Sequence, residues 1–483
     1  MTQSPSHRRP SLFDALLPIV VLVALLAAAV YLFGDSASSG PNQIALLLCA
    51  GLASLIAFKN GMSWRDIETA MIKGISVALG AVLILLSVGA LIGTWRLAGI
   101  VPSLIYFGLE LMNPALFYAA ACLICAIIAL SIGSSWTVAA TVGVALIGVA
   151  NGLGLSLPVA AGAVVSGAYF GDKISPLSET TNLAPAVAGS DLFEHIRLIF
   201  LFMGFNAEVA GGTVDRIRPL LAGLDNQFHI SFLHLIPLLV LLVLALKRMP
   251  ALPAIFLGAL LGGVWALLFQ PEAIAAQAGV AQADLAASLK VVWQTFYGGI
   301  TVETGDGALN DLLSGGGMAS MLNTVWLILC AMTFGAVMEH AGLLARLIEG
   351  LLAAVKGAAG LIAATLATCL GSNILTADQY ISIIMPGRMF REAYEKEGLA
   401  PVNLSRALED GGTITSPLIP WNTCGAYMQS VLLVPVTDYL FYAFFNLINP
   451  LLALVYAWLG IKVLRLTPPG AGGFPPGPST KPQ

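Results

Sequence analysis

Long apolar stretches separated by short polar connections make up most of this chain. An apolar run of about 20 residues is long enough to cross the hydrocarbon core of a bilayer as a helix. The stretches that reach this length are 13–33, 41–58, 74–93, 230–248, 250–269, 321–340 and 437–460. The stretch 270–320 is more polar and rich in glycine, which predicts an external loop with a short helix at 285–293. The pattern therefore predicts an all-α polytopic membrane protein.

Two further apolar stretches, about 158–190 and 410–435, are interrupted by polar residues and proline. Each interruption contains the triplet Ser-Pro-Leu, at 175–177 and again at 416–418, a separation of 416 − 175 = 241 residues. Paired interruptions of this kind, one in each half of a membrane chain, are the best sequence indication of a transport site. We therefore expect a broken helix in each half.

A second landmark precedes each triplet. Gly133-Ser134-Ser135-Trp136 interrupts one apolar run, and Gly371-Ser372-Asn373 interrupts another. The distances from Ser134 to Ser175 and from Ser372 to Ser416 are 41 and 44 residues. Two landmarks in the same order at nearly the same spacing predict a repeat in which each Gly-Ser segment is the tip of a re-entrant hairpin.

The loop charges predict how the two repeats are oriented. Only 10% of the residues are charged, against about 25% in soluble proteins. The connection 151–157 has no charge, whereas the matching connection in the second half carries Arg388, Arg391, Lys396 and Arg406. Because basic loops stay in the cytoplasm, the repeats are predicted to be inverted, with about ten spans plus two hairpins and both termini cytoplasmic. This scheme needs a crossing between Arg197 and Asp215, although that stretch is short and polar.

The same scheme divides the chain into five parts and places 97–112 and 343–356 along the membrane interface. The parts are N-terminal helices at 1–73, a first repeat at 74–214, linking helices and an external loop at 215–320, a second repeat at 321–460 and a disordered tail at 461–483. The lipid bilayer is the expected partner. Nucleic acid is not, because the lysines and arginines are scattered over loops. Cys122 and Cys125 are expected to be packing residues, and no enzyme motif or cofactor site is evident.

The breaks carry the candidate chemistry. Hydroxyl and amide oxygens, together with unwound backbone, suit a hard and dehydrated cation such as sodium. If tip and broken helix meet in each half, the residues brought together are Ser134, Ser135, Ser175, Ser178, Thr180, Thr181, Asn182, Ser372, Asn373, Thr376, Ser416, Asn422 and Thr423. The competing interpretation is that these side chains only satisfy local backbone groups or bind neighbouring helices.

Three acidic residues, Asp172, Glu179 and Asp378, lie in or beside the breaks. An ionisable group inside a membrane is a functional candidate, and a carboxyl that binds either a proton or a cation is the physical basis of exchange. Asp172 is the first choice for that shared carboxylate and Asp378 the second, while Asp172-Lys173 could instead be a buried ion pair. Glu409 and Asp410 are expected at the surface beside a charged loop. The first copy of the break is therefore expected to carry the proton chemistry.

The run from Gly167 to Gly189, which includes Asp172-Lys173-Ile174-Ser175-Pro176-Leu177-Ser178-Glu179, resembles the NhaC family of bacterial sodium/proton antiporters. The stretches 410–427 and 304–322 are similar to the same family. The resemblance covers about residues 40 to 460 and implies inverted repeats, residence in the bacterial inner membrane, and Na⁺ and H⁺ as transported ions. The chain departs from the family at 198–214, which is short and polar, and at Gly315, where a basic residue is expected.

The main hypothesis is exchange of internal sodium for external protons. The alternative is malate/lactate exchange coupled to sodium and protons, which would add organic carboxylates as substrates. An ion channel or a non-transporting membrane scaffold is the hypothesis from another class. The sequence is compatible with a homodimer but does not require one.

Overall fold

The computed structural model describes residues 8–33, 37, 39–111, 114–175, 178–190, 224, 227–247, 249–303, 310, 313–355 and 357–466. Within this part every named element is a helix, and strand pairing is limited to the isolated bridges Ile300–Gly315 and Leu399–Arg465. The predicted all-α fold is confirmed. The crossing predicted between Arg197 and Asp215 lies outside the described residues.

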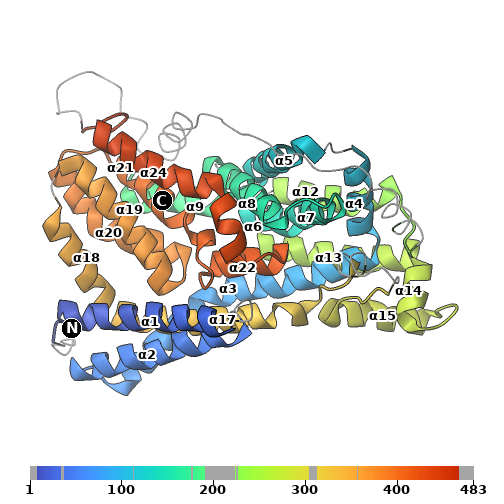
Figure 1. Cartoon of the computed structure of the whole chain (residues 1–483), viewed down its shortest axis with the longest axis horizontal. Coiled ribbons are helices and arrows are strands. Elements are labelled where there is room, and N and C mark those ends of the chain that lie inside the picture. Colours follow the sequence, from blue (N-terminus) through green and yellow to red (C-terminus); the bar gives the residue numbers. More distant parts are fainter. Residues whose placement is uncertain are drawn as a thin grey trace, which may run out of the picture.

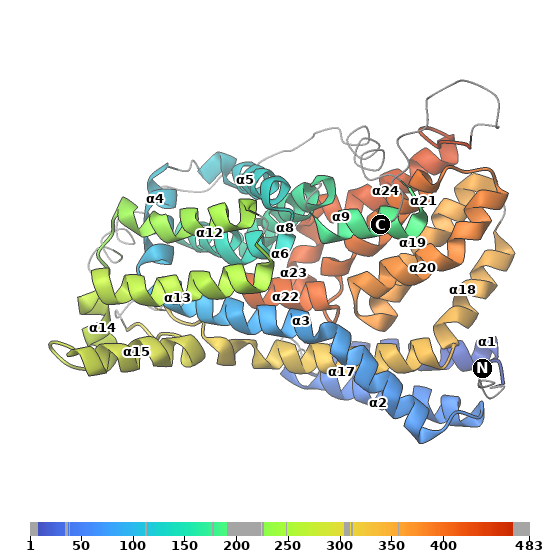
Figure 2. The ribbon, with the colours of Figure 1, turned by 180° about the vertical axis from the view of Figure 1, so that it is seen from behind.

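Long helices lie side by side along one side of the molecule (Figures 1 and 2). They are α1 (Leu12–Phe33), α2 (Pro41–Lys59), α3 (Trp64–Leu97), α13 (Ala251–Phe269) and α17 (Leu322–His340). Small residues allow the close contacts that drive helix association in lipid. A Cβ added at Gly74 of α3 would lie 2.4 Å from the Cβ of Ala336 on α17. The predicted spans at these positions are confirmed, and α3 is longer than its apolar run suggested.

The other connecting helices follow the predicted pattern only in part. They are α4 (Ile100–Leu111), η5 (Phe232–Leu235), α12 (Ile236–Leu246), α14 (Pro271–Ala278), α15 (Leu285–Gly298), η6 (Met318–Met321), α18 (Leu343–Ala354), α23 (Val436–Tyr439), η9 (Leu440–Tyr442) and α24 (Phe444–Leu459). Residues 270–320, predicted as a loop with one short helix, contain two named α-helices among the residues that the structure describes, the run 230–248 gives a shorter apolar helix, and the run 437–460 is bent. In the described part, eight helices are long and apolar enough to cross a membrane, or nine if the pair bent by 56° at Ala443 counts as one. The short helices α4 and α18 fall where interfacial connectors were expected.

Each half contains a sharp change of direction between two helices. In the first half, η2 (Pro114–Leu116) leads into α5 (Phe117–Ile132), which ends at Gly133 and is followed by α6 (Ser135–Val138), the π-helical turn η3 (Ala139–Gly143) and α7 (Val144–Gly152). In the second half, α19 (Gly357–Thr376) ends before Ala377 and is followed by α20 (Gln379–Lys396), which packs along it. Gly133 and Ala377 both have a left-handed backbone, with φ of 74° and 56°.

The second tip was predicted at the wrong place. Helix α19 runs unbroken through Gly371-Ser372-Asn373, and the chain reverses only at Ala377, which lies 377 − 371 = 6 residues after Gly371. A helix accommodates an isolated glycine at a cost of about 1 kcal/mol, so Gly371 does not force a break. The reversal needs a residue with positive φ, and Ala377 provides it even though alanine gives no sequence signal for that conformation.

Both predicted broken helices are present. Helix α8 (Leu157–Ile174) ends at Ser175, and α9 (Glu179–Ala188) begins after Ser178. In the second half, α21 (Pro401–Leu408) continues through the π-helical turn η7 (Glu409–Thr413) and the 3-10 turn η8 (Ser416–Leu418) before α22 (Thr423–Leu432) begins after Asn422. Residues 463–466, predicted to be tail, bond to the connection between α20 and α21, for example from Ala400 N to Leu464 O at 3.0 Å.

The helix N-caps reveal the repeat more sharply than the triplets do. Ser134 caps α6 and Ser178 caps α9, while Asp378 caps α20 and Asn422 caps α22. The spacing is 44 residues in each half, since 178 − 134 and 422 − 378 are equal. The triplets are not equivalent by this measure, because Ser175 lies three residues before its cap and Ser416 six residues before the other. The orientation of the two halves in a membrane remains a prediction.

Candidate ion-binding site

A single cavity collects the N-termini of the four capped helices. Its volume is about 660 Å³, and it lies between α3, the start of α13 and the breaks of both halves. The breaks lie in the middle of the molecule, beside α3 (Figure 1). Its polar lining comes from Ser134, Ser135, Thr137, Asp172, Ser178, Thr180, Asn182, Asp378, Gln379, Tyr380 and Thr423. In the first half the hairpin tip and the break both reach the cavity, as the sequence predicted. The second half contributes Asp378, Gln379, Tyr380 and Thr423, but neither its Gly-Ser nor its Ser-Pro-Leu landmark.

Close packing of α8 against α5 places Asp172 at this cavity. A Cβ at Gly167 would lie 2.1 Å from the carbonyl oxygen of Cys122, and one at Gly171 would lie 2.1 Å from that of Ala126. Only glycine fits this approach of one backbone to the other. Cys122 and its neighbour Cys125, which is buried, accordingly serve as packing residues.

Asp172 is bound by the tip of the first half. Ser135 donates to Asp172 Oδ2 from its backbone N at 3.1 Å and from its Oγ at 2.7 Å. Because Ser135 is the first residue of α6, the carboxylate also lies at the positive end of that helix dipole. Hydrogen bonds and dipole together stabilise a negative charge here. Asp172 is 7% exposed, so this charge is available to the cavity but largely shielded from bulk solvent.

Hydroxyl and amide groups surround this carboxylate. Ser134 Oγ accepts from Thr137 N at 3.2 Å and from Thr137 Oγ1 at 3.0 Å. Ser178 Oγ accepts from Thr181 N at 3.3 Å and lies 3.1 Å from Thr180 Oγ1. Asn182 donates its amide Nδ2 to Ser178 O at 2.6 Å. The first-half wall is therefore rich in oxygen atoms held in place by capping bonds.

Asp378 supplies the second carboxylate of the cavity. It caps α20, and its Oδ1 accepts from Ile381 N at 3.0 Å. Asp172 and Asp378 each offset the positive end of a helix. Among the described lining residues none is basic, so the cavity has negative charge and oxygen ligands without a fixed cation.

The amides of the second half are used for structure. Asn373 donates Nδ2 to Gly412 O at 2.6 Å and to Thr415 Oγ1 at 3.0 Å, and Asn422 donates Nδ2 to Asn373 Oδ1 at 3.0 Å. Asn422 Oδ1 accepts from Cys424 N at 3.0 Å. These bonds tie the end of α19 to the break before α22, behind the cavity wall.

Half of the predicted site residues line the cavity, and the other described ones lie behind it. Of those behind it, Ser175 donates to Leu130 O at 2.8 Å and Thr181 to Asp172 O at 3.1 Å. Thr376 donates to Ser372 O at 2.9 Å and Ser416 to Thr413 O at 2.7 Å. The side chain of Glu179 lies outside the described part.

Four charged residues turn out to be buried behind the cavity. The expectation of a surface position for Glu409 and Asp410 is wrong, since both are at most 1% exposed, and Arg406, predicted in a cytoplasmic loop, is 1% exposed. The alternative that Asp172 and Lys173 form a buried ion pair is wrong. Lys173 pairs with Asp410, and its Nζ also donates to Asn449 Oδ1 at 3.0 Å. Lys173 of the first half and Arg406 of the second compensate Asp410, whereas Glu409 has no hydrogen-bond partner among the described residues.

Gln379, Tyr380 and Trp136 are lining residues that the sequence reasoning missed. Gln379 and Tyr380 directly follow the predicted Asp378. Trp136 was part of the first landmark but was not chosen as a site residue, and Thr137, which also lines the cavity, follows it. Trp136 also joins the two halves, because its ring stacks on Tyr427 at 4.1 Å and its carbonyl accepts from Tyr427 Oη at 2.9 Å.

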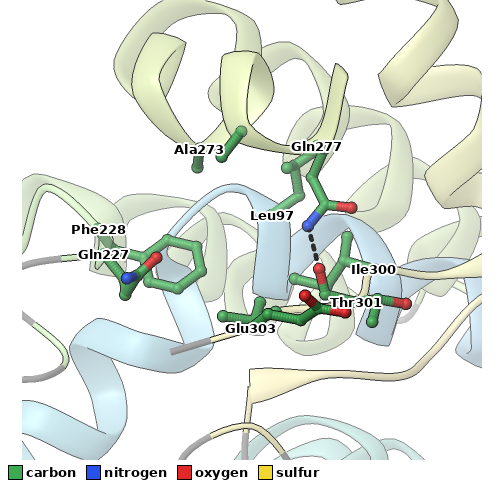
Figure 3. A pocket seen from close by; sticks show the side chains of 10 residues that line it. Leu97, Gln227, Phe228, Ala273, Gln277, Ile300, Thr301 and Glu303 are labelled. Atoms are coloured by element: carbon green, nitrogen blue, oxygen red, sulfur yellow. Dashed lines mark hydrogen bonds between the residues drawn. The ribbon is translucent and has the colours of Figure 1, made fainter. Parts of the chain in front are cut away.

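A second cavity of about 350 Å³ has a lining that shares no residue with the first. It is lined by Leu97, by residues 227–228 and 300–303, and by α14, whose Gln277 donates to the carbonyl of Thr301 (Figure 3). Glu303 is the carboxylate among its lining residues, and none of the predicted site residues is there. It therefore does not form part of the candidate site.

Comparison with known proteins decides the family. The model described as "Na+/H+ antiporter family" matches residues 11–209 and 168–461. The chain belongs to the Na⁺/H⁺ antiporter family. It is 37% identical to the Na(+)/H(+) antiporter NhaC of Alkalihalophilus pseudofirmus over 87% of this chain and 91% of that protein. The predicted resemblance is confirmed.

Two other relatives of this antiporter-family chain have names that include organic substrates. It is 35% identical to the malate-2H(+)/Na(+)-lactate antiporter of Bacillus subtilis, over 94% of this chain and 96% of that protein. It is 36% identical to the arginine/ornithine antiporter ArcD of Halobacterium salinarum, over 96% and 95% of the two chains. Membership of the family therefore leaves the substrate to be argued from the site.

Proposed function

We propose that this protein exchanges sodium for protons across the bacterial inner membrane, and that Asp172 is the carboxylate to which sodium binds. The observation that carries the proposal is the cavity itself. It combines two buried carboxylates with hydroxyl and amide oxygens, and its described lining has no basic residue. Hard cations prefer oxygen ligands, and a proton competes with a cation for the same buried negative charge.

The proposed ligands divide between the two halves. Asp172, Ser135, Ser178, Thr180 and Asn182 come from the first half, and the second half adds Asp378 and Thr423. We further propose that the halves are inverted, with both termini cytoplasmic, because the loop charges favour that arrangement. Alternating access would then come from movement of the two halves around this central cavity.

Exchange of an organic carboxylate is the second candidate function. Four helix N-termini face the cavity, and such termini bind carboxylates without any arginine. Asp172 and Asp378 already occupy two of these termini, which leaves those of α9 and α22. The sodium proposal is favoured because a bound carboxylate would lie near two like charges with no fixed cation among the described lining residues.

The test is proton flux in liposomes that contain the purified protein. Sodium, potassium, malate, lactate and arginine are added in turn to the side opposite an imposed pH gradient. We expect sodium alone to drive proton movement. Strict dependence on malate, lactate or arginine would reject simple cation exchange, and downhill sodium flux that ignores the pH gradient would indicate a channel.

A further inference from the structure

A cluster of charged side chains lies behind the cavity, where α8 meets the π-helical turn η7. Lys173 pairs with Asp410, Asn449 donates Nδ2 to Asp410 Oδ1 at 2.8 Å, and Arg406 Nε lies 3.8 Å from Asp410 Oδ2. Asp410 thus faces two cations. Asp172 precedes Lys173 on the same helix and faces the cavity.

Glu409 is the member of this cluster with the poorest hydrogen bonding. Its side chain is 0% exposed, and neither carboxyl oxygen has a hydrogen-bond partner among the described residues. The hydroxyl of Thr413, one turn further on, is the near neighbour but lies outside hydrogen-bonding geometry. A buried carboxylate without donors costs several kcal/mol, a cost that protonation removes. Asp172 differs, because Ser135 donates two hydrogen bonds to it.

The charged groups whose fields act on Glu409 are Lys173, Asp172 and Asp410. Arg406 lies one turn before it on α21. The other buried titratable side chains on α19 and α20, which pack against η7, are Cys369, Tyr394 and the N-cap Asp378. The charged residues of α20 at 388, 391, 392, 395 and 396 are exposed, and Tyr380 and Tyr456 are half-buried. Asp378 caps α20 and carries the same charge before and after sodium binds at Asp172, so it does not change the difference between the two states. The described side chains of α24 at this place are the neutral Asn446 and Asn449.

Charge balance couples Glu409 to the cavity. With Glu409 protonated, the cations Lys173 and Arg406 balance the anions Asp172 and Asp410. When sodium binds at Asp172, one positive charge is added, and ionisation of Glu409 restores neutrality. A net charge inside a membrane protein is expensive, so each of these two neutral states is favoured over any mixed state.

We infer that Glu409 is the residue that holds the exchanged proton, and that sodium at Asp172 displaces this proton through the charge balance of the cluster. The inference rests on the proposed sodium exchange and assigns its proton to a second carboxyl. Ser416 connects this region to the cavity, because its Oγ bonds to Thr413 O at 2.7 Å and to Gln379 Oε1 at 3.3 Å, and Gln379 lines the cavity.

The test is sodium affinity of the purified full-length protein, measured across a series of pH values together with proton release on sodium addition. For the wild type we expect the dissociation constant to rise about tenfold per unit fall in pH on the acidic side of the titration, with proton release. Glu409→Gln should bind sodium weakly at every pH, with no pH dependence and no proton release. Glu392→Gln, an exposed carboxylate change on α20, is the control and should behave as the wild type.

Glu409→Asp keeps the carboxyl, so it distinguishes the loss of the proton site in Glu409→Gln from a failure of that variant to fold. We expect Glu409→Asp to retain the pH dependence of the sodium dissociation constant and the proton release, with the midpoint of the titration shifted to another pH. A wild-type pH profile in Glu409→Gln, or an unshifted midpoint in Glu409→Asp, would overturn the assignment. If the wild type itself neither binds sodium nor releases protons, the proposed function fails instead, so the two failures are distinguishable.

Discussion

The helix caps of the two halves have the same spacing, but their side chains and the chemistry around them differ. Ser134 and Ser178 in the first half correspond in spacing to Asp378 and Asn422 in the second. Around the first pair, Asp172 and a set of hydroxyls face the cavity. Around the second pair, Asn373 and Asn422 bind each other and the backbone of η7. The two copies therefore share their cap spacing, and we propose that the first provides most of the ligands, joined by Asp378 and Thr423, while the amides of the second stabilise the break.

Removing the carboxylate of the first copy is the strongest way to break this comparison. We expect Asp172→Asn to abolish sodium-dependent proton flux, because it removes the negative charge that would bind the cation. The protein should remain folded, since an amide oxygen still accepts from Ser135. Flux in everted vesicles and the amount of protein in the membrane are the measurements. Asp438→Asn, an exposed change on α23, is the matched control, and retained exchange in Asp172→Asn would refute the assignment.

Removing an amide of the second copy should lower the stability of the protein and leave sodium binding unchanged, which is the reverse of the effect expected at Asp172. Asn373→Ala removes the side-chain donor to the carbonyl of Gly412 and one of the two acceptors of the Asn422 amide, which keeps the main-chain carbonyl of residue 373. Buried polar groups left unpaired cost about 1–3 kcal/mol each, so we expect a marked fall in the unfolding temperature of the purified protein. Sodium affinity of the molecules that fold should be unchanged.

The exposed Asn151→Ala on α7 is the control for this experiment and should leave the unfolding temperature as it is. A loss of sodium affinity at wild-type stability in Asn373→Ala would show that Asn373 contributes directly to the ion site, and its assignment to a structural role would be wrong.

The division between the halves was visible in the sequence, but its details were not. Apolar runs of sufficient length gave α1, α2, α13 and α17 nearly to the residue, because the bilayer constrains length and composition strongly. The presence of Asp172 in the first copy likewise indicated one carboxylate of the cavity, although the exchanged proton, expected in the first copy, is proposed to lie on Glu409 of the second. Both inferences depend only on local composition.

Contacts between distant segments could not be obtained in this way. The ion pair of Lys173 with Asp410 joins residues 237 positions apart, so hydropathy alone assigned Asp410 and Glu409 to the surface. The second tip was misplaced for a similar reason, since Ala377 adopts a positive φ only because the surrounding structure requires it. The caps themselves could have been aligned at their common spacing of 44 residues, which the more obvious triplets obscured.

Removing one hydrogen bond to Asp172 tests the role of the hairpin tip in the first half. Ser135→Ala removes the Oγ donor to Asp172 but keeps the backbone donor. Hydrogen bonds to charged groups contribute about 1.5–3 kcal/mol, so we expect the sodium affinity to change by at least about tenfold with exchange still measurable. Ser131→Ala, an exposed serine one turn earlier on α5, should have no effect. An unchanged affinity in Ser135→Ala would mean that the tip does not position the carboxylate.

The smallest effect is expected at the carboxylate of the second copy. Asn is as good an N-cap as Asp, so Asp378→Asn should keep α20 capped and change the exchange rate by no more than about twofold. Asp378→Ala removes the cap as well and should cost about 1 kcal/mol of stability. The pair of variants separates charge from capping at one position, with exchange rate and unfolding temperature as the readouts. Loss of exchange in Asp378→Asn at wild-type stability would make the Asp378 carboxylate as essential to sodium binding as that of Asp172, because charge alone distinguishes that variant from the native side chain.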